Sequence, residues 1–420
     1  MTASAEIICV GTELLLGDIL NSNAQFLGQQ LAKLGIPHYY QTVVGDNRLR
    51  IQKTIAIACE RSQLLIFTGG LGPTPDDLTH EAIAEFFDSP LVERPEIIET
   101  IRQRYAHRNP QSISPSNDKQ ARIPQGANIL PNPIGSAPGI IWEARPGLTI
   151  LTFPGVPREM QVMWEETAVP YLQSHGLSQF TIYSRMLRYW GIPEATLSDT
   201  VKSFFDLENP TVAPYASNGE VRLRISAKAD SQDAAMQIIA PIEEQIKALT
   251  SEDCFGVDDE TLASAVATLL MQSDHTISVA ESCTGGGLGH LLTTQAGSSA
   301  YFKGGIIAYS NSVKINLLGV SEADLAREGA VSETVAKQMA VGVRSALEST
   351  WGLSITGIAG PGGGSEDKPV GLVYFGIAGP DQVVFYRRVF ASFRGRDWIR
   401  WLSACTALDL LRRLYMEKRK

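Results

Sequence analysis

The sequence lacks paired cysteines and long apolar runs. Its five cysteines are scattered through 420 residues without a CxxC pair. This pattern excludes a disulfide framework and a structural zinc site, and it is typical of a reducing compartment. No apolar run approaches the roughly 18 residues that a membrane span needs, and no signal-peptide pattern opens the chain. We therefore expect a cytoplasmic protein without a membrane partner.

An excess of positive charge is also missing. The net charge is −9, which argues against a protein that binds nucleic acid through bulk electrostatics, and no basic or aromatic nucleic-acid motif is evident. Direct nucleic-acid binding is therefore not expected. The hydrophobic content of 44% and the charged content of 19% are ordinary for a globular protein, and the length predicts several domains.

Strand and helix patterns alternate over the first part of the chain, which we assign to a domain at residues 1–170. Apolar runs typical of buried strands alternate with helical patterns at residues 6–11, 21–35, 38–46, 48–60, 62–70 and 76–87. This alternation predicts a doubly wound, mostly parallel sheet with helices on both faces. A polar segment at residues 109–139 is too long for a simple connection, so we expect it to fold over a site as a lid.

Two further domains follow. Strand, helix, strand and helix patterns between residues 180 and 249 predict a small α+β module, assigned to residues 175–252. Residues 258–420 predict an α/β domain with a mixed sheet. Its last helix, residues 396–415, has an amphipathic pattern. The apolar side of that pattern carries Trp398, Trp401, Leu402, Cys405 and Leu408.

The stretch TGGLGPTPDDLTHE at residues 68–81 is the first candidate site. A glycine-rich turn follows a predicted strand, and we expect a helix to begin at Asp76 or Asp77. Such a junction presents backbone N–H groups to a phosphate. The two carboxylates would repel that anion unless a divalent cation lay between them, so we favour a metal site at Asp76 and Asp77 over simple helix capping.

Other residues should meet this site at the carboxyl edge of the sheet, where such folds bind ligands. His80 is expected on the helix surface rather than as a ligand. The predicted ligand-binding residues are Thr12, Glu13, Gly69, Gly70 and Gly72.

The stretch AESCTGGG at residues 280–287 is the second candidate site, with Ser282 and Cys283 as alternative nucleophiles. Cys283 is intrinsically more reactive, but neither His275 nor His290 is well placed in the sequence to activate it. A desolvated lysine can activate a serine instead, and Lys314 lies in an otherwise apolar helical turn.

Tyr309, at the end of a predicted strand, could orient or relay a proton. Spacing alone nevertheless favours a surface lysine at Lys314 and a core aromatic at Tyr309. A second glycine-rich loop at residues 357–371 could form an anion-binding nest, although such a loop is a weak signal by itself.

Motifs along the whole chain resemble the competence/damage-inducible protein A (CinA) family of bacteria. The matching stretches, in the family's order, are GTELLLGDILNSN, TGGLGPTPDDLT, FPGVPREM, AESCTGG, GSSAYFKGGIIAYSNSVK and GIAGPGGGSEDKPVG. The resemblance implies a molybdopterin-binding-like first domain, a KH-type middle domain and a C-terminal amidase domain. The middle domain has no obvious GxxG clamp, which puts RNA binding in doubt.

The resemblance also implies two activities. The C-terminal domain is expected to convert nicotinamide mononucleotide to nicotinate mononucleotide and ammonia without a cofactor. The first domain is expected to hydrolyse ADP-ribose to AMP and ribose 5-phosphate with Mg²⁺, Mn²⁺ or Co²⁺. A homodimer is expected from the family. The alternatives are a pterin- or nucleotide-binding first domain without chemistry, or a partner protein in competence or DNA damage.

Roles for single residues follow from the matched motifs. Ser282 corresponds to the family's nucleophile, and Tyr309 and Lys314 to its tyrosine and lysine. The stretch FRGRDWIR is one residue shorter than the family's pattern and lacks its acidic residue, which leaves Arg396 and Arg400 as its arginines. The expected substrate-binding residues are Cys283, Thr284, Gly285 and Gly286 around the oxyanion, with Gly360, Gly362, Gly363 and Arg396 around the 5′-phosphate.

Overall fold

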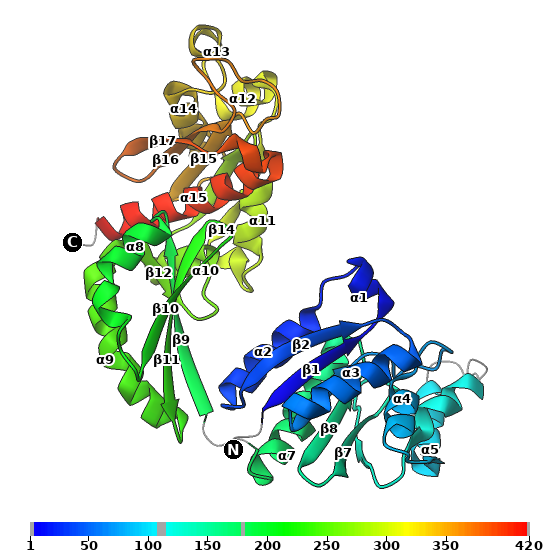
Figure 1. The fold of residues 1–420 in the computed structure, drawn as a ribbon. Coiled ribbons are helices and arrows are strands. Elements are labelled where there is room, and N and C mark those ends of the chain that lie inside the picture. The colour runs from blue at the N-terminus through cyan, green and yellow to red at the C-terminus, as the bar shows by residue number, and fades with distance from the viewer. Residues whose placement is uncertain (1–3, 107–114, 178–180, 418–420) are drawn as a thin grey trace. The chain divides into compact units, whose positions relative to one another are not determined.

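The structure, a computed structural model, describes residues 4–106, 115–177 and 181–417. Residues 109–114 of the predicted segment 109–139 therefore lie outside the described residues. Residue 180, the first of the strand predicted at 180–189, also lies outside them. The described chain divides into two compact units, one with the N-terminal domain and one with the sheets that follow (Figure 1). No described helix is long and apolar enough to cross a membrane.

The N-terminal domain contains a six-stranded sheet in the order β2-β1-β3-β8-β7-β6. The first four of these strands pair in parallel, and β7 and β6 are antiparallel. The strands are β1 Ala5–Val10, β2 His38–Val44, β3 Leu64–Thr68, β6 Asn128–Leu130, β7 Gly139–Arg145 and β8 Leu148–Phe153. The helices are α1 Thr12–Leu16, α2 Ser22–Lys33, α3 Arg48–Arg61, α4 Thr79–Phe86, α5 Pro95–Ala106, α6 Pro157–Met163 and α7 Val169–Ser174.

Both faces of this sheet are covered. Ile7 and Cys9 of β1 pack in a core with residues of α2 and α6, while Ile8 and Val10 pack in a second core with residues of α3 and α4. A strand buried on both faces reads as a continuous apolar run, which is why EIICV lacks the alternation of a half-exposed strand. The doubly wound, mostly parallel sheet that the sequence predicted is confirmed.

The middle domain is a four-stranded sheet in the order β10-β11-β9-β12. Its elements are β9 Thr181–Trp190, α8 Glu194–Thr200, β10 Thr211–Ser217, β11 Glu220–Ala229, α9 Gln232–Thr250 and β12 Cys254–Val257. The sequence pattern predicted β9, α8, β11 and α9 but not the two edge strands. β10 contains Pro214 and is largely exposed, and β12 has only four residues, so neither carries a clear strand signal.

The C-terminal sheet is mixed, as predicted, in the order β14-β13-β15-β16-β17. β13 pairs in parallel with β14 and β15, and β16 and β17 continue the sheet as antiparallel strands. The strands are β13 Ile277–Glu281, β14 Phe302–Ile307, β15 Trp351–Gly357, β16 Leu372–Ala378 and β17 Val383–Val389. The helices are α10 Leu262–Gln272, α11 Gly287–Thr293, α12 Asn311–Leu318, α13 Glu322–Glu328, α14 Glu333–Ala346 and α15 Arg396–Glu417. Of these, α13 was not predicted.

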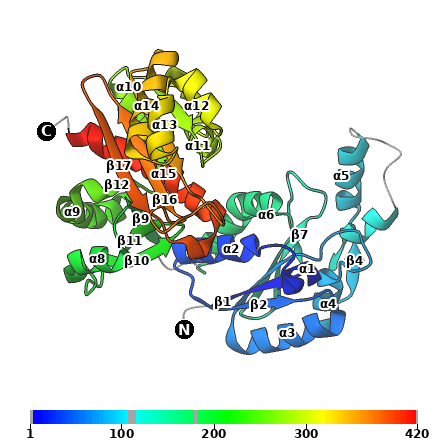
Figure 2. The same cartoon turned by 90° about the horizontal axis from the view of Figure 1, so that it is seen from above.

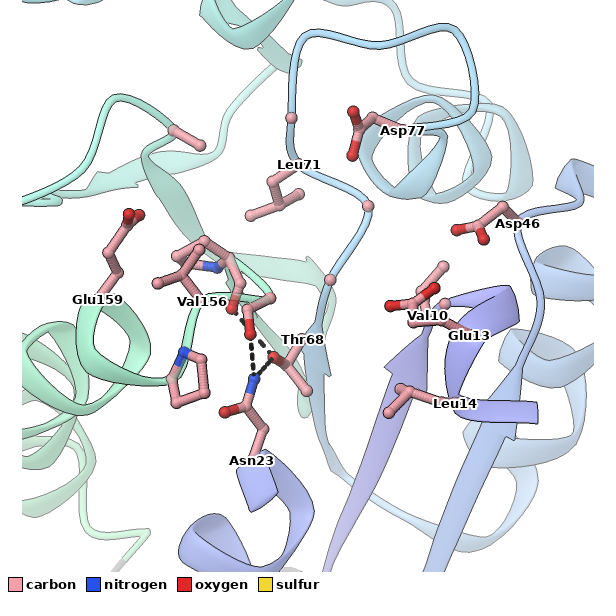
Figure 3. Close-up of a pocket in the computed structure, with 18 of the residues that line it drawn as sticks. Val10, Glu13, Leu14, Asn23, Asp46, Thr68, Leu71, Asp77, Val156 and Glu159 are labelled. Carbon is pink, nitrogen blue, oxygen red and sulfur yellow. Dashed lines mark hydrogen bonds between the residues drawn. The ribbon is translucent and has the colours of Figure 1, made fainter. Parts of the chain in front are cut away.

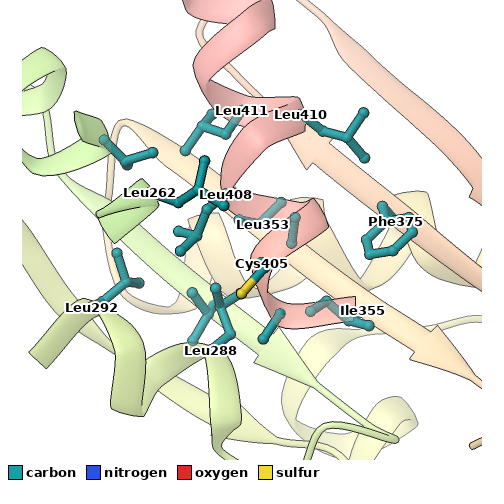
Figure 4. Packing of buried hydrophobic residues seen from close by; sticks show 14 of the residues in the cluster. Leu262, Leu288, Leu292, Leu353, Ile355, Phe375, Cys405, Leu408, Leu410 and Leu411 are labelled. Atoms are coloured by element: carbon teal, nitrogen blue, oxygen red, sulfur yellow. The ribbon is translucent and has the colours of Figure 1, made fainter. Parts of the chain in front are cut away.

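Helices again cover both faces of the C-terminal sheet. α14 lies across one face, with α12 and α13 beside it (Figures 1 and 2). α10, α11 and α15 cover the other face. There, Leu288 of α11 and Leu408 of α15 pack near Leu353 and Ile355 of β15 (Figure 4).

The amphipathic pattern predicted for α15 is wrong over the middle of the helix. Every residue from 403 to 412 is buried, and Trp401, placed on the apolar side, is 41% exposed. The reason is that the middle domain covers the side of α15 that the C-terminal sheet leaves free. Trp190 Nε1 donates to Thr406 Oγ1 at 3.4 Å, and Trp401 Nε1 donates to the carbonyl of Asn218 at 3.1 Å.

Burial of α15 on all sides encloses charged groups. The Asp409 carboxylate lies 2.7 Å from Arg412 Nη2 and 2.7 Å from Arg413 Nε. Asp409 and Arg412 are 4% and 2% exposed. The carboxylate therefore compensates a guanidinium that has almost no contact with solvent.

Asp409→Ala leaves the Arg412 guanidinium buried without its carboxylate, and the expected cost is about 3–5 kcal/mol of folding free energy. Differential scanning calorimetry of the full chain should show a lower melting temperature for the transition of the second unit only. Asp367→Ala, at an exposed loop position, is the matched control and should melt like the parent protein. Equal melting temperatures for the two variants would contradict this account of α15.

Candidate functional site

The turn after β13 is organised by Glu281, a residue that the sequence reasoning did not single out. Its carboxylate is 2% exposed and accepts three backbone hydrogen bonds, from Gly286 and Leu288 at 3.0 Å and from Gly289 at 2.8 Å. These donors lie at or before the first turn of α11, where N–H groups have no partner within the helix. No sequence pattern signals this role, because three residues separate Glu281 from the glycine run and its hydrogen bonds depend on the geometry of the turn.

Two glycines give the turn its shape. Gly285 and Gly286 have φ values of +59° and +98°, in the left-handed region that side chains disfavour. The chain therefore turns at these two glycines, shortly after Ser282. The Glu281 carboxylate holds the segment that follows the turn through its backbone hydrogen bonds. This arrangement holds Ser282 at the end of a buried strand, with 9% of its surface exposed.

Lys314 contacts Ser282. Its Nζ lies 3.2 Å from Ser282 Oγ, 2.6 Å from the carbonyl oxygen of Ala308 and 3.2 Å from that of Tyr309. The side chain comes from the first turns of α12 and is 1% exposed. The surface position that spacing favoured for Lys314 is therefore wrong. Burial lowers the pKa of Lys314, because desolvation disfavours the ammonium form.

Tyr309 is not the core aromatic that spacing favoured, since it is 63% exposed. Its phenol oxygen lies 3.1 Å from Arg396 Nη2, and Arg396 Nη1 donates to the carbonyl of Gly360 at 2.7 Å. Among the described residues, no hydrogen bond joins this phenol to Lys314 or Ser282. The predicted proton relay therefore has no support in the geometry, and Tyr309 reaches Lys314 through its backbone carbonyl.

Cys283 packs in the core of the C-terminal domain and is 6% exposed. Burial raises the pKa of its thiol to about 12. The thiolate, which is the nucleophilic form, is therefore scarce at neutral pH. The geometry favours Ser282 over Cys283 as the nucleophile.

A cleft of about 270 Å³ opens at these residues. Eight predicted site residues line it: Ser282, Cys283, Tyr309, Lys314, Gly360, Gly362, Gly363 and Arg396. Thr284, Gly285 and Gly286 do not line it. They lie behind Ser282, where Arg400 Nη2 donates to the carbonyl of Thr284 at 3.0 Å.

Fewer backbone N–H groups than predicted are available to stabilise an oxyanion. Within residues 283–286, the N–H of Gly285 already donates to the Ser282 carbonyl at 3.2 Å, and that of Gly286 donates to Glu281. Across the described residues, the N–H groups of Cys283 and Thr284 donate no backbone hydrogen bond. Of the two, only Cys283 lines the cleft, so its amide is the donor in this turn that can face a developing negative charge.

The N-terminal domain has its own pocket, of about 560 Å³, at the carboxyl edge of the parallel strands (Figure 3). Glu13, Gly69, Gly70, Gly72, Asp76 and Asp77 line it, as predicted. Thr12 does not, because its backbone N–H and hydroxyl both bond Asp46 Oδ2 at 2.8 Å. Gln120, from the segment predicted as a lid, also lines the pocket and donates to the carbonyl of Leu71 at 3.2 Å.

Glycine is required where this loop passes β1. At Gly69, which has a φ of +98°, a Cβ would lie 2.1 Å from the carbonyl oxygen of Val10. At Gly70, with a φ of +67°, a Cβ would lie 2.3 Å from Thr79 Oγ1. No side chain fits at either position without moving the neighbouring strand or helix, so the loop keeps its backbone close to the pocket.

The predicted start of the helix at Asp76 or Asp77 is wrong, because α4 begins at Thr79. Asp77 Oδ2 accepts instead from the backbone N–H of Thr74 at 2.9 Å, and the single O–H of Thr74 is shared between the carboxylates of Asp76 and Asp77. The bond from Thr74 lowers the pKa of Asp76. Both the expected helix N-terminus and the capping alternative are therefore replaced by a turn that holds two carboxylates together.

His80 was expected on the helix surface, which is also wrong. Its ring is 9% exposed, and Nε2 lies 2.9 Å from Thr152 Oγ1. Burial lowers the pKa of His80 to about 4, so the ring is neutral at physiological pH. His80 packs against the sheet and does not line the acidic pocket.

The side chains of the N-terminal pocket carry negative charge only. Among the described residues, its lining includes the carboxylates of Glu13, Asp46, Asp76, Asp77 and Glu159 and no lysine or arginine. In the described chain, no three His, Cys, Asp or Glu side chains are placed to hold a metal ion by themselves. One or two carboxylates with ligand oxygens completing the shell remain a suitable set for Mg²⁺.

Comparison with known proteins gives matches along the chain. Residues 6–174 match the family model described as "Probable molybdopterin binding domain", residues 184–256 the "Damage-inducible protein CinA KH domain" and residues 259–415 the "CinA C-terminal domain". The CinA-like protein of Cyanothece sp. is 66% identical over 413 residues, covering 98% of this chain and 99% of its own. That of Thermosynechococcus vestitus is 63% identical over 411 residues, covering 98% of each.

Solved structures resemble parts of the chain. The competence/damage inducible protein CihA from Agrobacterium tumefaciens is 40% identical, covering 36% of this chain and 93% of its own, with a TM-score of 0.36. The CinA protein from Thermoplasma acidophilum is 33% identical, covering 40% of this chain and 98% of its own, with a TM-score of 0.38.

Glu281→Gln should destabilise the turn that carries Ser282, because the new amide group places N–H donors against backbone N–H donors. The expected loss is roughly 1.5–3 kcal/mol, the scale of hydrogen bonds to charged groups. Thermal unfolding of the full chain measures it, with Glu322→Gln, at an exposed position on α13, as the matched control. If both variants melt at the same temperature, Glu281 does not organise the turn.

Proposed function

This chain belongs to the CinA family, and we propose that its C-terminal domain hydrolyses the amide of nicotinamide mononucleotide to give nicotinate mononucleotide and ammonia. The observation that carries the proposal is the 3.2 Å contact between Lys314 Nζ and Ser282 Oγ. A serine hydroxyl is a weak nucleophile until a base removes its proton, and a desolvated lysine is such a base.

The partners of Lys314 accommodate the neutral amine. A neutral amine has two N–H donors and one lone pair, and the carbonyl oxygens of Ala308 and Tyr309 can only accept. With both donors on these carbonyls, the lone pair faces Ser282, whose hydroxyl can donate. Burial favours this neutral form, since it lowers the pKa of Lys314.

The reaction then follows from the geometry. Lys314 takes the proton of Ser282 Oγ as this oxygen attacks the amide carbon, and the N–H group of Cys283 stabilises the negative oxygen. Lys314 returns the proton to the leaving nitrogen as the C–N bond breaks, which releases ammonia and leaves an ester on Ser282. Water hydrolyses that ester, with Lys314 moving its proton to Ser282.

The opposite wall of the cleft fits the nucleotide's phosphate. Gly362 and Gly363 expose backbone beside Arg396, in a loop where no side chain blocks approach to Gly362. Arg396 uses one N–H on Gly360 and one on Tyr309, so three of its five donors remain. We assign the 5′-phosphate to this group, which leaves the nicotinamide toward Ser282.

Ser282→Ala and Lys314→Met should each reduce ammonia release from nicotinamide mononucleotide by at least about a thousandfold, because nucleophile and base act as one unit. Cys283→Ala and the exposed Lys303→Met are the matched controls and should keep most of the activity. Full activity in Ser282→Ala or Lys314→Met would contradict the proposed pair of Ser282 as nucleophile and Lys314 as base. Loss in Cys283→Ala alone would move the nucleophile to the thiol.

For the N-terminal domain we propose cation-dependent hydrolysis of ADP-ribose to AMP and ribose 5-phosphate. The supporting observation is a pocket whose described lining has five carboxylates and no basic side chain, beside a glycine-rich loop. Such a lining repels a pyrophosphate unless a cation neutralises it. Asp76 and Asp77, held together by Thr74, would hold Mg²⁺, Mn²⁺ or Co²⁺, and the ion would offset the charge of the pyrophosphate.

Purified full-length protein should form AMP from ADP-ribose when one of these cations is present and stop when a chelator removes it. Asp77→Asn should lower the rate about a hundredfold or more, since it removes one charged ligand. Asp88→Asn, at an exposed turn, and Ser282→Ala should leave AMP formation unchanged. Binding of ADP-ribose without AMP formation under any of the three cations would contradict the proposal and indicate a binding domain.

A further inference from the structure

A second cavity of the C-terminal unit shares no lining residue with the cleft at Ser282. It has about 480 Å³ and lies where the end of β9 and the β10–β11 turn meet α15 and β17. Its volume is within the range of small-ligand pockets. The side chains that give it chemical character are Trp190, Arg388, Phe390, Trp398, Asp409 and Arg413.

Aromatic rings form part of the wall. Trp190 is 5% exposed, and its indole N–H is already used on Thr406 Oγ1, so this ring closes the wall and offers no donor. Trp398, on the first turns of α15, is half-buried, with the Arg394 guanidinium 4.7 Å from its ring centroid, and Phe390 follows β17. Indole and phenyl faces are the surfaces on which flat heteroaromatic bases stack.

Some charged groups of the cavity are paired with an opposite charge, and one is not. Arg413 bonds Asp409 Oδ2 at 2.7 Å, Asp253 Oδ1 at 2.9 Å and the carbonyl of Trp190 at 2.9 Å. The negative charge of Asp409 is thereby balanced within the protein. Arg388 is exposed at the edge of the cavity, with a hydrogen bond only to the neighbouring carbonyl of Arg387, at 3.0 Å, and no ion pair among the described residues.

We propose that this cavity is a second binding site, and that it takes a free 5′-mononucleotide. The base stacks on the partly exposed rings of Phe390 and Trp398, and the phosphate pairs with Arg388. A guanidinium without a carboxylate partner, at the edge of an aromatic pocket, matches a ligand with a flat ring and a phosphate. An apolar ligand would leave the Arg388 guanidinium without a negatively charged partner.

The proposed site and the Ser282 cleft are connected through α15. Trp398, Asp409 and Arg413 lie along α15, the helix whose first turns also carry Arg396 and Arg400. Those two arginines hold the carbonyls of Gly360 and Thr284 at the Ser282 cleft. A bound nucleotide would therefore contact the same helix that supports both the glycine loop and the nucleophile turn.

The experiment measures binding of AMP and UMP to the full chain by calorimetry, with adenosine and uridine as probes without phosphate. Arg388→Ala should weaken AMP binding at this site by at least about tenfold, the scale of a hydrogen bond to a charged group. Trp398→Leu should weaken it by a similar factor through lost stacking. Arg387→Ala removes the same charge from the next residue of β17, which does not line the cavity, and should bind like the parent protein.

Controls separate this site from the proposed catalytic pockets. Asp77→Asn and Ser282→Ala should keep the binding that Arg388→Ala removes, and unfolding curves show whether each variant is folded. Equal AMP affinity in Arg388→Ala and Arg387→Ala would overturn the proposal, as would equal affinity of adenosine and AMP for the parent protein. A ten-residue uridine RNA that binds more tightly than UMP, and loses that binding in Arg388→Ala, would also overturn it by identifying a nucleic-acid strand as the ligand.

Discussion

Burial of the Lys314 amine among oxygen atoms is the constraint on which the proposed chemistry depends. Desolvation disfavours the ammonium form, while the carbonyls of Ala308 and Tyr309 fix the direction of the N–H groups. The burial that costs folding free energy thus also favours the form that can act as a base. Glu281 supplies the other half of the arrangement, because its carboxylate accepts three amides and holds Ser282 within reach.

α15 connects these local arrangements to the rest of its unit. Its first turns hold the glycine loop and the nucleophile turn through Arg396 and Arg400. Its last turns are fixed to the middle domain through Arg412 and Arg413, which bond the carbonyls of Glu252 and Trp190. The middle domain therefore completes the environment of a helix that the C-terminal sheet alone would leave half exposed, which gives this KH-type module a structural role.

The sequence predicted the elements with strong periodicity and missed those that tertiary packing decides. The doubly wound sheet and the mixed C-terminal sheet followed from apolar runs, whereas the short or proline-containing edge strands of the middle domain gave no clear signal. Spacing placed Lys314 at the surface and Tyr309 in the core, because neighbours in sequence do not show which strand lies across from a helix. The hydrogen bonds of Glu281 and Thr74 were likewise invisible, since they depend on turn geometry.

The most direct test of the account is the protonation state of Lys314. NMR titration of full-length protein carrying ¹³C-labelled lysine side chains, with the Lys314→Met variant identifying the signal, gives its pKa in the folded chain. We expect Lys314 to titrate below the ordinary lysine value of 10.5, and the rate of ammonia release to rise with pH through the same transition. A Lys314 signal that remains that of an ammonium group up to the ordinary value would contradict the account.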